Sequence, residues 1–271
     1  MPELPEVETV KESLKIKLLN KKIKSMNIYY ENILAYPDKE KFQELIKEKV
    51  ILDIKRRGKW LMFDLDNYYL LSHLRMEGKY FIKDINEEIL KHEHISFNLN
   101  DNTKLVYKDV RKFGKMYLIE KDNIYNVAPL KDIGLEPWDD NLNINYLKDK
   151  YKNKSLAIKT VLLDQSIIAG IGNIYADEIL FLAKINPLKK AKELTNKELS
   201  NIIKYTKEEL EKAIKMGGTT IRSYTSVNGI NGLFQQELNV HTKKVCNVCN
   251  KKIEKIRVNG RGTYYCPKCQ K

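Results

Sequence analysis

The chain has 271 residues, of which 42% are apolar and 31% are charged, a composition typical of folded globular proteins. At about 100 to 200 residues per domain, this length predicts one large or two moderate domains, with enough chain to bury a real core. Lysine and arginine total 49 against 36 acidic residues, and the net charge of +13 favours a polyanionic partner, nucleic acid before an anionic membrane. A lysine-rich composition can also reflect an AT-rich genome, so charge alone does not identify the partner. No apolar run approaches the roughly 18 residues of a membrane span, so we do not expect a membrane protein.

The first predicted element is a helix that begins at Pro5, because proline suits a first helical position and the acidic Glu6 and Glu8 follow in the first turn. Its apolar residues recur at helical spacing and form one stripe, Val7, Val10, Leu14 and Leu18. Residues 1–4 are therefore expected to precede the helix. The opening decapeptide MPELPEVETV lacks the basic and apolar stretches of a signal peptide, so we expect an intracellular, cytoplasmic chain.

Between residues 50 and 119 the pattern changes to that of β-strands. The predicted strands are Ile51–Asp66, Tyr68–Met76, Ile95–Leu99 and Leu105–Tyr107, the last two flanking a turn at residues 101–102. This half of the chain is therefore expected to be mostly antiparallel β. The Gly and Pro residues in 133–137 are typical of a linker, and helical periods follow them.

The clearest helix of the second half begins with a capping box formed by Thr195 and Glu198, beside a staple of Leu194 and Leu199. Its apolar face carries Leu199, Ile202, Ile203, Leu210 and Ile214. Two glycines at 217–218 end it. The chain is therefore predicted to be α+β and multidomain, with a β-rich first half and a helical second half.

All four cysteines fall within the last 26 residues, as two Cys-x-x-Cys pairs with sixteen residues between them: Cys246, Cys249, Cys266 and Cys269. Four thiolates at this spacing close a tetrahedral site, so we expect one structural Zn(2+) ion and no open position for chemistry. The alternative, disulfide pairing, requires an oxidising compartment. Residues 253–265, between the pairs, predict a β-hairpin around an Asn259-Gly260 turn. A module this short depends on its metal for much of its folding energy.

Residues 1–4 include a candidate nucleophile. Met1 precedes a small residue and would commonly be removed, which leaves Pro2 with a free secondary amine. Amines attack carbonyl-like carbons, and the iminium of a secondary amine has no N–H to lose, so it stays cationic and promotes elimination. Glu3 is the adjacent carboxylate. The alternative interpretation is an ordinary terminal proline beside a solvated glutamate.

Motifs from both ends and the middle of the chain point to one family. They are MPELPEVETV, Arg56-Arg57-Gly58-Lys59-Trp60, His73-Leu74-Arg75-Met76-Glu77-Gly78, Lys91-His92-Glu93-His94, Arg111-Lys112-Phe113-Gly114, DQSIIAGIGNIYADE at 164–178 and the zinc segment from Arg261 to Lys271. With these motifs the chain resembles the formamidopyrimidine-DNA glycosylases, the bacterial repair enzymes for 8-oxoguanine. The resemblance implies an N-terminal antiparallel β-sandwich with a leading helix (1–132), a helix-two-turn-helix domain (133–235) and a four-cysteine zinc-finger hairpin (236–271), with DNA between the domains.

The resemblance also implies catalytic roles for four residues. The nucleophile falls on Pro2, the general acid/base carboxylate on Glu3, and proton transfer during elimination on Lys59. Arg261 corresponds to the arginine that reaches the damaged site and assists the later elimination. Without the resemblance, Lys59 would suggest a snorkelling strand lysine, because apolar residues follow it, and Arg261 a solvated turn residue.

A base inside a duplex cannot expose its C1′ atom, so the nucleotide must be flipped out and the gap held open by wedging side chains. The resemblance assigns this task to Met76, Arg111 and Phe113, although Met76 and Phe113 alone suggest core residues. Two departures from the family lie beside Phe113: Lys112 stands where a second arginine is common and Val110 where a proline is frequent. They leave the local loop shape open.

Phosphate contacts are implied for His92, Lys154 and Asn173. Asn173 is predicted to open a helix, whose N-terminal amides can meet a phosphate. Residues 217–234, rich in Gly, Thr, Ser and Asn, match the loop expected to cover the flipped base.

We therefore expect a monomeric, bifunctional DNA glycosylase and AP lyase of base excision repair. It would remove oxidised purines (8-oxoguanine, formamidopyrimidines) from double-stranded DNA through an N-terminal proline Schiff base with β,δ-elimination, without a membrane partner. An endonuclease VIII type enzyme for oxidised pyrimidines shares this chemistry but usually begins Pro-Glu-Gly-Pro, whereas this chain has Pro2-Glu3-Leu4-Pro5. A non-catalytic zinc-finger protein that binds nucleic acid through charge alone is the alternative from a different class.

Overall fold

The structure is a computed structural model, and it describes residues 1–219 and 232–271. The described residues form two compact units. Among the described residues, the first contains residues 1–2, 6–131, 219 and 232, and the second contains residues 3–5, 132–218 and 233–271. Among the helices of the described ranges, none combines the length and the apolar character that a bilayer crossing requires.

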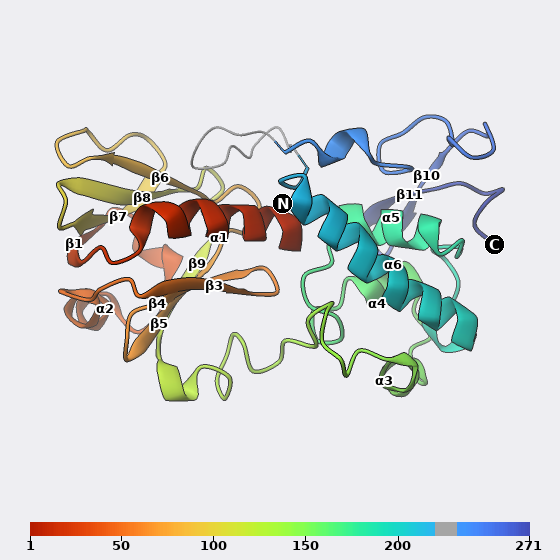
Figure 1. Ribbon diagram of the computed structural model, residues 1–271, viewed down its shortest axis with the longest axis horizontal. Helices are drawn as coiled ribbons and strands as arrows, with labels where there is room; N and C mark the ends of the chain where they lie inside the picture. The colour runs from red at the N-terminus through yellow and green to blue at the C-terminus, as the bar shows by residue number, and fades with distance from the viewer. Residues whose placement is uncertain (220–231) are drawn as a thin grey trace. The chain divides into compact units, whose positions relative to one another are not determined.

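Two β-sheets and two α-helices build the first unit (Figure 1). One sheet is antiparallel and has the order β1 (Ile23–Ile28), β7 (Glu93–Leu99), β8 (Thr103–Lys108) and β6 (Lys79–Asp84). The other has the order β2 (Leu34–Tyr36), β9 (Lys115–Glu120), β5 (Tyr68–His73), β4 (Trp60–Asp64) and β3 (Asp53–Arg57); β2 pairs with β9 in parallel, and the other pairs are antiparallel. The helices are α1 (Leu4–Leu18), which belongs to this unit from Glu6 onward, and α2 (Lys39–Ile46). Two 3-10 turns, η1 (Glu31–Ile33) and η2 (Lys121–Asn123), complete it.

Apolar side chains from both sheets and from α1 share one core, which makes this unit the antiparallel β-sandwich with a leading helix that was predicted. The predicted stripe on α1 is the part of the helix that enters this core. All four of its side chains are buried: Val7, Val10, Leu14 and Leu18. Each contributes roughly 1.5–3 kcal/mol through removal of apolar surface from water, so α1 is firmly fixed to the sandwich.

Several predicted boundaries in the first half of the chain differ from the structure, and the strand predicted over Tyr68–Met76 ends at His73. Helix α1 begins at Leu4, because the Leu4 N–H donates to the Gly170 carbonyl (3.1 Å) and the Leu4 side chain is buried. The predicted strand Ile51–Asp66 is two strands, β3 and β4, joined by a tight turn in which Gly58 has a φ of 55°. Lys59 therefore lies in a turn between strands.

Four α-helices and a β-hairpin form the described part of the second unit (Figure 1). The helices are α3 (Ile144–Tyr151), α4 (Ile158–Leu162), α5 (Asn173–Leu182) and α6 (Asn196–Lys215), and the hairpin strands are β10 (Glu254–Val258) and β11 (Arg261–Tyr265). Two further 3-10 turns are η3 (Ala191–Glu193) and η4 (Phe234–Gln236). Helix α5 contacts both α6 and β11, so it joins the helical core to the hairpin.

The local signals predicted for this unit are confirmed. Thr195 and Glu198 form the capping box, each side chain accepting a hydrogen bond from the backbone N–H of the other. Asn259 and Gly260 have φ values of 44° and 78°, as a two-residue hairpin turn requires.

Candidate active site and DNA-contacting residues

Helix α5 holds the carboxylate of Glu3. Glu3 is 2% exposed, and its oxygens accept hydrogen bonds from the backbone N–H groups of Ile174 (2.9 Å) and Tyr175 (3.4 Å). Both N–H groups belong to the first turn of α5, where unsatisfied donors and the helix dipole stabilise negative charge. Because Glu3 accepts from these two donors, the phosphate contact predicted at this end of α5 falls to Asn173, where it stays a prediction.

The Gly-x-Gly sequence at 170–172 makes room for the N-terminal segment. A Cβ atom at Gly172 would lie 2.2 Å from the carboxyl carbon of Glu3, and one at Gly170 would lie 2.3 Å from the Leu4 side chain. Gly170 also has a φ of 91°, which residues with a side chain rarely adopt. In the sequence, this motif directly precedes the helix that was expected to contact phosphate through Asn173. The role of the motif in seating Glu3 was missed because the contacting residues Glu3 and Ile174 are 171 positions apart.

Pro2 and Lys59 belong to the first unit. Pro2 is buried and stands two residues before the start of α1, and Lys59 is 6% exposed. Burial, with the positive charges of Arg75 and Lys59, lowers the pKa of His73 to about 3. His73 is therefore neutral at pH 7, and its Nδ1 accepts a hydrogen bond from the Arg75 backbone N–H (2.9 Å). Near Lys59, His73 therefore carries no positive charge of its own at pH 7.

The three predicted wedge residues lie on two loops of the first unit. Arg111 and Phe113 are on the loop between β8 and β9, and Met76 is on the turn after β5. The Phe113 side chain is 50% exposed, and the Arg111 guanidinium carbon lies 4.7 Å from its ring centroid. Met76 is half-buried. The interpretation of Met76 and Phe113 as core residues is therefore wrong.

Both loops pass the hydroxyl group of Tyr107. A Cβ atom would lie 2.4 Å from that oxygen at Gly78 and 1.8 Å from it at Gly114. The two glycines follow Met76 and Phe113 by two residues and one residue. The fully buried Tyr107 therefore brings the two wedge-bearing loops to a common anchor.

Asp109 shapes the loop that carries Phe113, a role that was not predicted from the sequence. Asp109 is fully buried; its Oδ1 accepts from the N–H of Arg111 (3.0 Å) and its Oδ2 from the N–H groups of Phe113 (2.9 Å) and Gly114 (2.8 Å). Aspartate commonly binds backbone N–H groups a few residues ahead in turns, so its position before this loop was an available signal.

The side chains at the two departures from the family pattern, Val110 and Lys112, lie outside the hydrogen bonds that Asp109 makes to this loop. Val110 is 52% exposed. The Lys112 Nζ atom lies 4.3 Å from the ring centroid of Tyr30. Neither side chain hydrogen-bonds the Asp109 carboxylate, but Lys112 has a φ of 57° and its N–H donates to the Asp109 carbonyl (3.3 Å), so the backbone of residue 112 belongs to the loop's frame.

His92 and Lys154 carry the implied phosphate contacts outside α5. His92 is half-buried, and desolvation followed by the positive charges of neighbours such as Lys91 lowers its pKa. That positive surrounding suits an anionic ligand. The Lys154 Nζ atom lies 3.2 Å from the Asp164 carboxylate, so a phosphate at Lys154 would share the ammonium with Asp164 or displace it.

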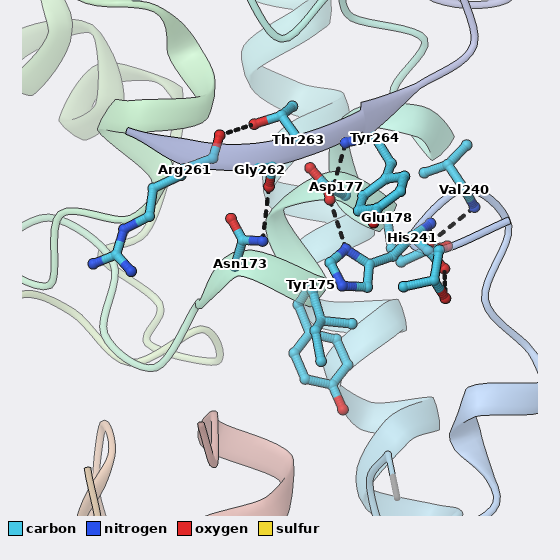
Figure 2. A network of polar contacts seen from close by, with 12 residues as sticks. Asn173, Tyr175, Asp177, Glu178, Val240, His241, Arg261, Gly262, Thr263 and Tyr264 are labelled. Carbon is cyan, nitrogen blue, oxygen red and sulfur yellow. Dashed lines mark hydrogen bonds and ion pairs between the residues drawn. The ribbon is translucent and has the colours of Figure 1, made fainter. Parts of the chain in front are cut away.

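Asn173 and Arg261 meet at the N-terminal end of α5. The Asn173 Nδ2 donates to the Gly262 carbonyl (2.9 Å), and its Oδ1 is buried with no partner among the described residues. Arg261 is the first residue of β11, and its exposed side chain extends away from the strand and from Asp177 (Figure 2). Glu3, Asn173 and Arg261 therefore gather at one end of a single helix, within the second unit.

The four cysteines form a cluster that fits one zinc ion. Their Sγ atoms all lie within 4.8 Å of one another, and this is the metal-ligand group found in the described part of the chain. A backbone N–H from Lys251 is the main cause that lowers the pKa of Cys249 to about 7, whereas burial and the neighbouring sulfurs raise the pKa of Cys269 to about 12. Four negative sulfurs this close repel one another, and a divalent cation removes that repulsion. The donor set therefore suits structural Zn(2+), with no position left open for a substrate.

The loop expected to cover the flipped base, 217–234, lies largely outside the described residues, which end at 219 and resume at 232.

Three family models match successive parts of the chain. Residues 1–116 match the formamidopyrimidine-DNA glycosylase N-terminal domain, and residues 133–225 match the H2TH domain of the same glycosylases. Residues 243–271 match the zinc finger found in FPG and IleRS.

Relatives with this architecture align along the whole chain. A formamidopyrimidine-DNA glycosylase of Oceanobacillus iheyensis is 46% identical over 273 residues, covering 100% of this chain and 98% of its own, and one of Listeria monocytogenes is 43% identical with 100% of both chains covered. A Lactococcus lactis FPG mutant in complex with Fapy-dG containing DNA is 39% identical, with a TM-score of 0.93 and 99% of each chain covered. A Lactococcus lactis Fpg in complex with an abasic site containing DNA matches equally well. On its sequence, its domains and its fold, the chain belongs to the formamidopyrimidine-DNA glycosylase family.

Proposed function

We propose that this protein is a bifunctional DNA glycosylase and AP lyase that removes oxidised purines from double-stranded DNA. The observation that carries the proposal is the seating of Glu3: a buried carboxylate, held by the first turn of α5, directly follows a proline that becomes an N-terminal amine once Met1 is removed. The family relatives support the substrate class, because solved members hold DNA with Fapy-dG or with an abasic site. We expect the enzyme to act as a monomer on the bacterial chromosome.

In the proposed reaction, the Pro2 nitrogen attacks C1′ of the damaged nucleotide, and the glycosidic bond breaks with its electron pair leaving on the base. Glu3 moves the proton that this departure requires. Loss of the base leaves Pro2 bonded to C1′ of a closed sugar; the C1′–O4′ bond then breaks with its electron pair on O4′, which takes up a proton, and the opened sugar is joined to Pro2 as an iminium. The iminium accepts the electrons released when a proton leaves C2′, and the C3′–O bond to the 3′ phosphate breaks (β-elimination). A second elimination breaks the bond to the 5′ phosphate. We assign proton transfer in these later steps to Lys59 and stabilisation of the departing phosphate to Arg261.

The loop residues supply access to the lesion. Met76 and Phe113 are apolar, and both stand clear of the core, so they can occupy the gap left by a flipped nucleotide while Arg111 contacts the orphaned base. His92, Lys154 and Asn173 would hold the flanking phosphates. The structural Zn(2+) ion orders the hairpin that presents Arg261.

Borohydride trapping tests the nucleophile. Reduction of the iminium should attach the protein covalently to an 8-oxoguanine duplex only when mass spectrometry shows a free Pro2 terminus. A variant with one residue retained before Pro2 has an amide nitrogen with no nucleophilic lone pair, so it should bind the lesion and fail to trap. Full excision by the extended protein would overturn the Pro2 mechanism and make Lys59 the next candidate amine.

A second experiment distinguishes the role of Glu3 from that of the Pro2 amine. Glu3→Gln should lose base excision more than elimination at a preformed abasic site, because the aldehyde needs no leaving-group proton. Trapping across duplexes with oxidised purines and oxidised pyrimidines decides between this function and the endonuclease VIII type. DNA binding that weakens with salt, together with no trapping on any lesion, would instead support the non-catalytic zinc-finger protein.

A further inference from the structure

Strand β11 is attached to helix α5 at two points on either side of Thr263 (Figure 2). At the first point, Asn173 Nδ2 donates to the Gly262 carbonyl (2.9 Å). At the second, the Tyr264 backbone N–H donates to Asp177 Oδ2 (3.3 Å). Asn173 and Asp177 on the helix therefore each form a hydrogen bond with one backbone group of β11, the strand that begins with Arg261.

The spacing of the two points matches on both elements. Residues four apart in an α-helix are separated by about 6 Å along the axis, and residues two apart in a strand by about 6.6 Å. Asn173 and Asp177 are one helical turn apart, and Gly262 and Tyr264 are two strand residues apart. Both contacts therefore form together without distortion in the register seen here, and a shift of β11 by one residue would turn both backbone groups to the opposite edge of the strand and break them.

Asp177 is itself fixed by two further groups. Its Oδ1 accepts from Lys159 Nζ (2.5 Å) and its Oδ2 contacts His241 Nδ1 (2.7 Å), and both Asp177 and Lys159 are essentially fully buried. The His241 ring also packs against the Tyr264 ring, with centroids 5.0 Å apart. A buried carboxylate with three partners has little freedom to move, so the second contact point is rigid.

Lys159 links the two contact points. Besides Asp177, its Nζ donates to the backbone carbonyl of Asn173 (2.7 Å). Burial lowers the pKa of Lys159, and the opposing charge of Asp177 offsets part of that effect. The amine therefore ties the beginning of α5 to the residue one turn later.

We propose that Asp177 is a positioning residue for Arg261: by holding the Tyr264 N–H, it fixes the register of β11 on α5 and so the place from which Arg261 reaches the DNA. Asp177 touches no reacting atom in this scheme and acts through the strand. The proposal rests on the function proposed above for Arg261. The attachment itself can be measured without DNA.

Asp177→Asn alone would leave the buried Lys159 without a charged partner and could prevent folding. Two double variants avoid this, Lys159→Met with Asp177→Asn and Lys159→Met with Asp177→Leu. Both lack the buried charges and the Lys159 link. The asparagine keeps a carbonyl oxygen for the Tyr264 N–H, whereas leucine offers no polar group to Tyr264 or His241, so the pair differs on the side of residue 177 that faces β11.

The first measurement is amide hydrogen exchange in the zinc-loaded full chain. The Tyr264 amide should exchange roughly tenfold or more faster in the leucine variant than in the asparagine variant, while amides in the centre of α6 stay equally protected. Zinc content should be the same in both, because the four cysteines are unchanged. Equal Tyr264 exchange in the two folded variants would overturn the attachment. If the leucine variant does not fold, the double variant Lys159→Met with Asp177→Ser replaces it, because the shorter serine side chain holds its hydroxyl farther from the Tyr264 N–H.

The second measurement is single-turnover elimination on a preformed abasic-site duplex at saturating enzyme. Misplacing a group by about 1 Å can cost up to roughly a hundredfold in rate, so we expect the leucine variant to be on the order of tenfold slower than the asparagine variant. In an Arg261→Ala background the two should have the same rate, since no arginine is left to position. Equal loss in both backgrounds would show that Asp177 does not act through Arg261.

The two measurements separate this proposal from the proposed function. A wild-type protein that fails to trap on any lesion would refute the function, while the Tyr264 exchange still reports on the attachment. Asp149→Asn, a change of the same type in an exposed ion pair with Lys152, controls for loss of a carboxylate from this unit and should alter neither readout.

Discussion

Glu209 is a buried acid that the proposed chemistry does not use. It lies on α6 and is 5% exposed, and its Oε1 has no hydrogen-bond partner among the described residues. Burial, with the negative charges of Glu178 and Glu237, raises the pKa of Glu209 to about 7, although Lys212 opposes the shift. The folded protein therefore prefers a protonated Glu209.

This preference predicts a pH-dependent stability. Because the folded pKa lies above the ordinary value of 4.5, the contribution of Glu209 is fully present below pH 4.5 and is lost as the pH rises through 7. Glu209→Gln keeps the shape without the charge. It should raise the free energy of unfolding by up to about 3 kcal/mol at pH 8 and by little at pH 4.5. Urea unfolding of both proteins at the two pH values measures this.

Glu208→Gln is the matched control, because Glu208 is the preceding residue on α6 and its side chain is 57% exposed. It should change stability by less than about 0.5 kcal/mol at either pH. A Glu209→Gln protein with the same pH dependence as the wild type would contradict the raised pKa.

At the scale of elements, the loop between β8 and β9 depends on one carboxylate. Asp109→Asn replaces one of the two accepting oxygens by an NH2 group, which cannot accept from the N–H donors of Arg111, Phe113 and Gly114 that the carboxylate now serves. Leaving buried donors unsatisfied costs about 1–3 kcal/mol, so lesion binding should weaken roughly five- to a hundredfold. Fluorescence of 2-aminopurine next to the lesion should report slower or smaller base extrusion.

Asp101→Asn is a comparable change in the β7–β8 turn, where Asp101 Oδ1 accepts from the Thr103 N–H and hydroxyl groups (3.2 and 2.6 Å). It should leave extrusion unaffected, because this turn carries none of the proposed DNA contacts. Normal extrusion by a folded Asp109→Asn protein would show that the loop keeps its shape without the carboxylate.

A second prediction at this scale concerns the β10–β11 hairpin, whose structure is expected to depend on zinc. Cys249→Ser leaves zinc with three sulfur ligands, so the hairpin should loosen and DNA affinity should fall, while the rest of the chain stays folded. Arg261→Ala should keep full zinc content and slow elimination. Zinc analysis, circular dichroism and duplex binding distinguish the two variants. Unchanged affinity and activity in protein without zinc would show the hairpin to be dispensable.

For the molecule as a whole, the net charge of +13 predicts salt-dependent binding. Log affinity for undamaged duplex should fall linearly with log salt, with a slope near −0.9 per phosphate contact. About five contacts, including those proposed for Lys154 and Arg261, give a slope near −4.5. Lys154→Ala should reduce the slope by about one, whereas Lys190→Ala, in an exposed pair with Glu193, should not. A slope near zero would remove the electrostatic part of the proposal.

Features that depend on a few neighbouring residues could be predicted from the sequence alone. The capping box of Thr195 and Glu198, the Asn259-Gly260 turn and the cysteine spacing each depend on contacts within a short stretch of chain. These contacts form whatever packs against them elsewhere in the molecule, which is why the start of a helix, a hairpin and a metal site could be predicted. The start of α1 was predicted one residue too late, because it depends on a hydrogen bond from the Leu4 N–H to the distant Gly170 carbonyl.

The amino-acid sequence by itself determined the classes of element, the zinc ligands and, through resemblance, the residues assigned to chemistry. The tertiary structure decided how those residues are held: Glu3 by amides 171 and 172 positions away, the wedge loop by Asp109, and β11 by Asp177. It also decided the charge states, since the neutral His73 and the raised pKa of Glu209 follow from burial among particular neighbours. Periodicity and composition carry no record of such contacts, because hydrogen bonds and desolvation depend on distances that exist only once the chain has folded.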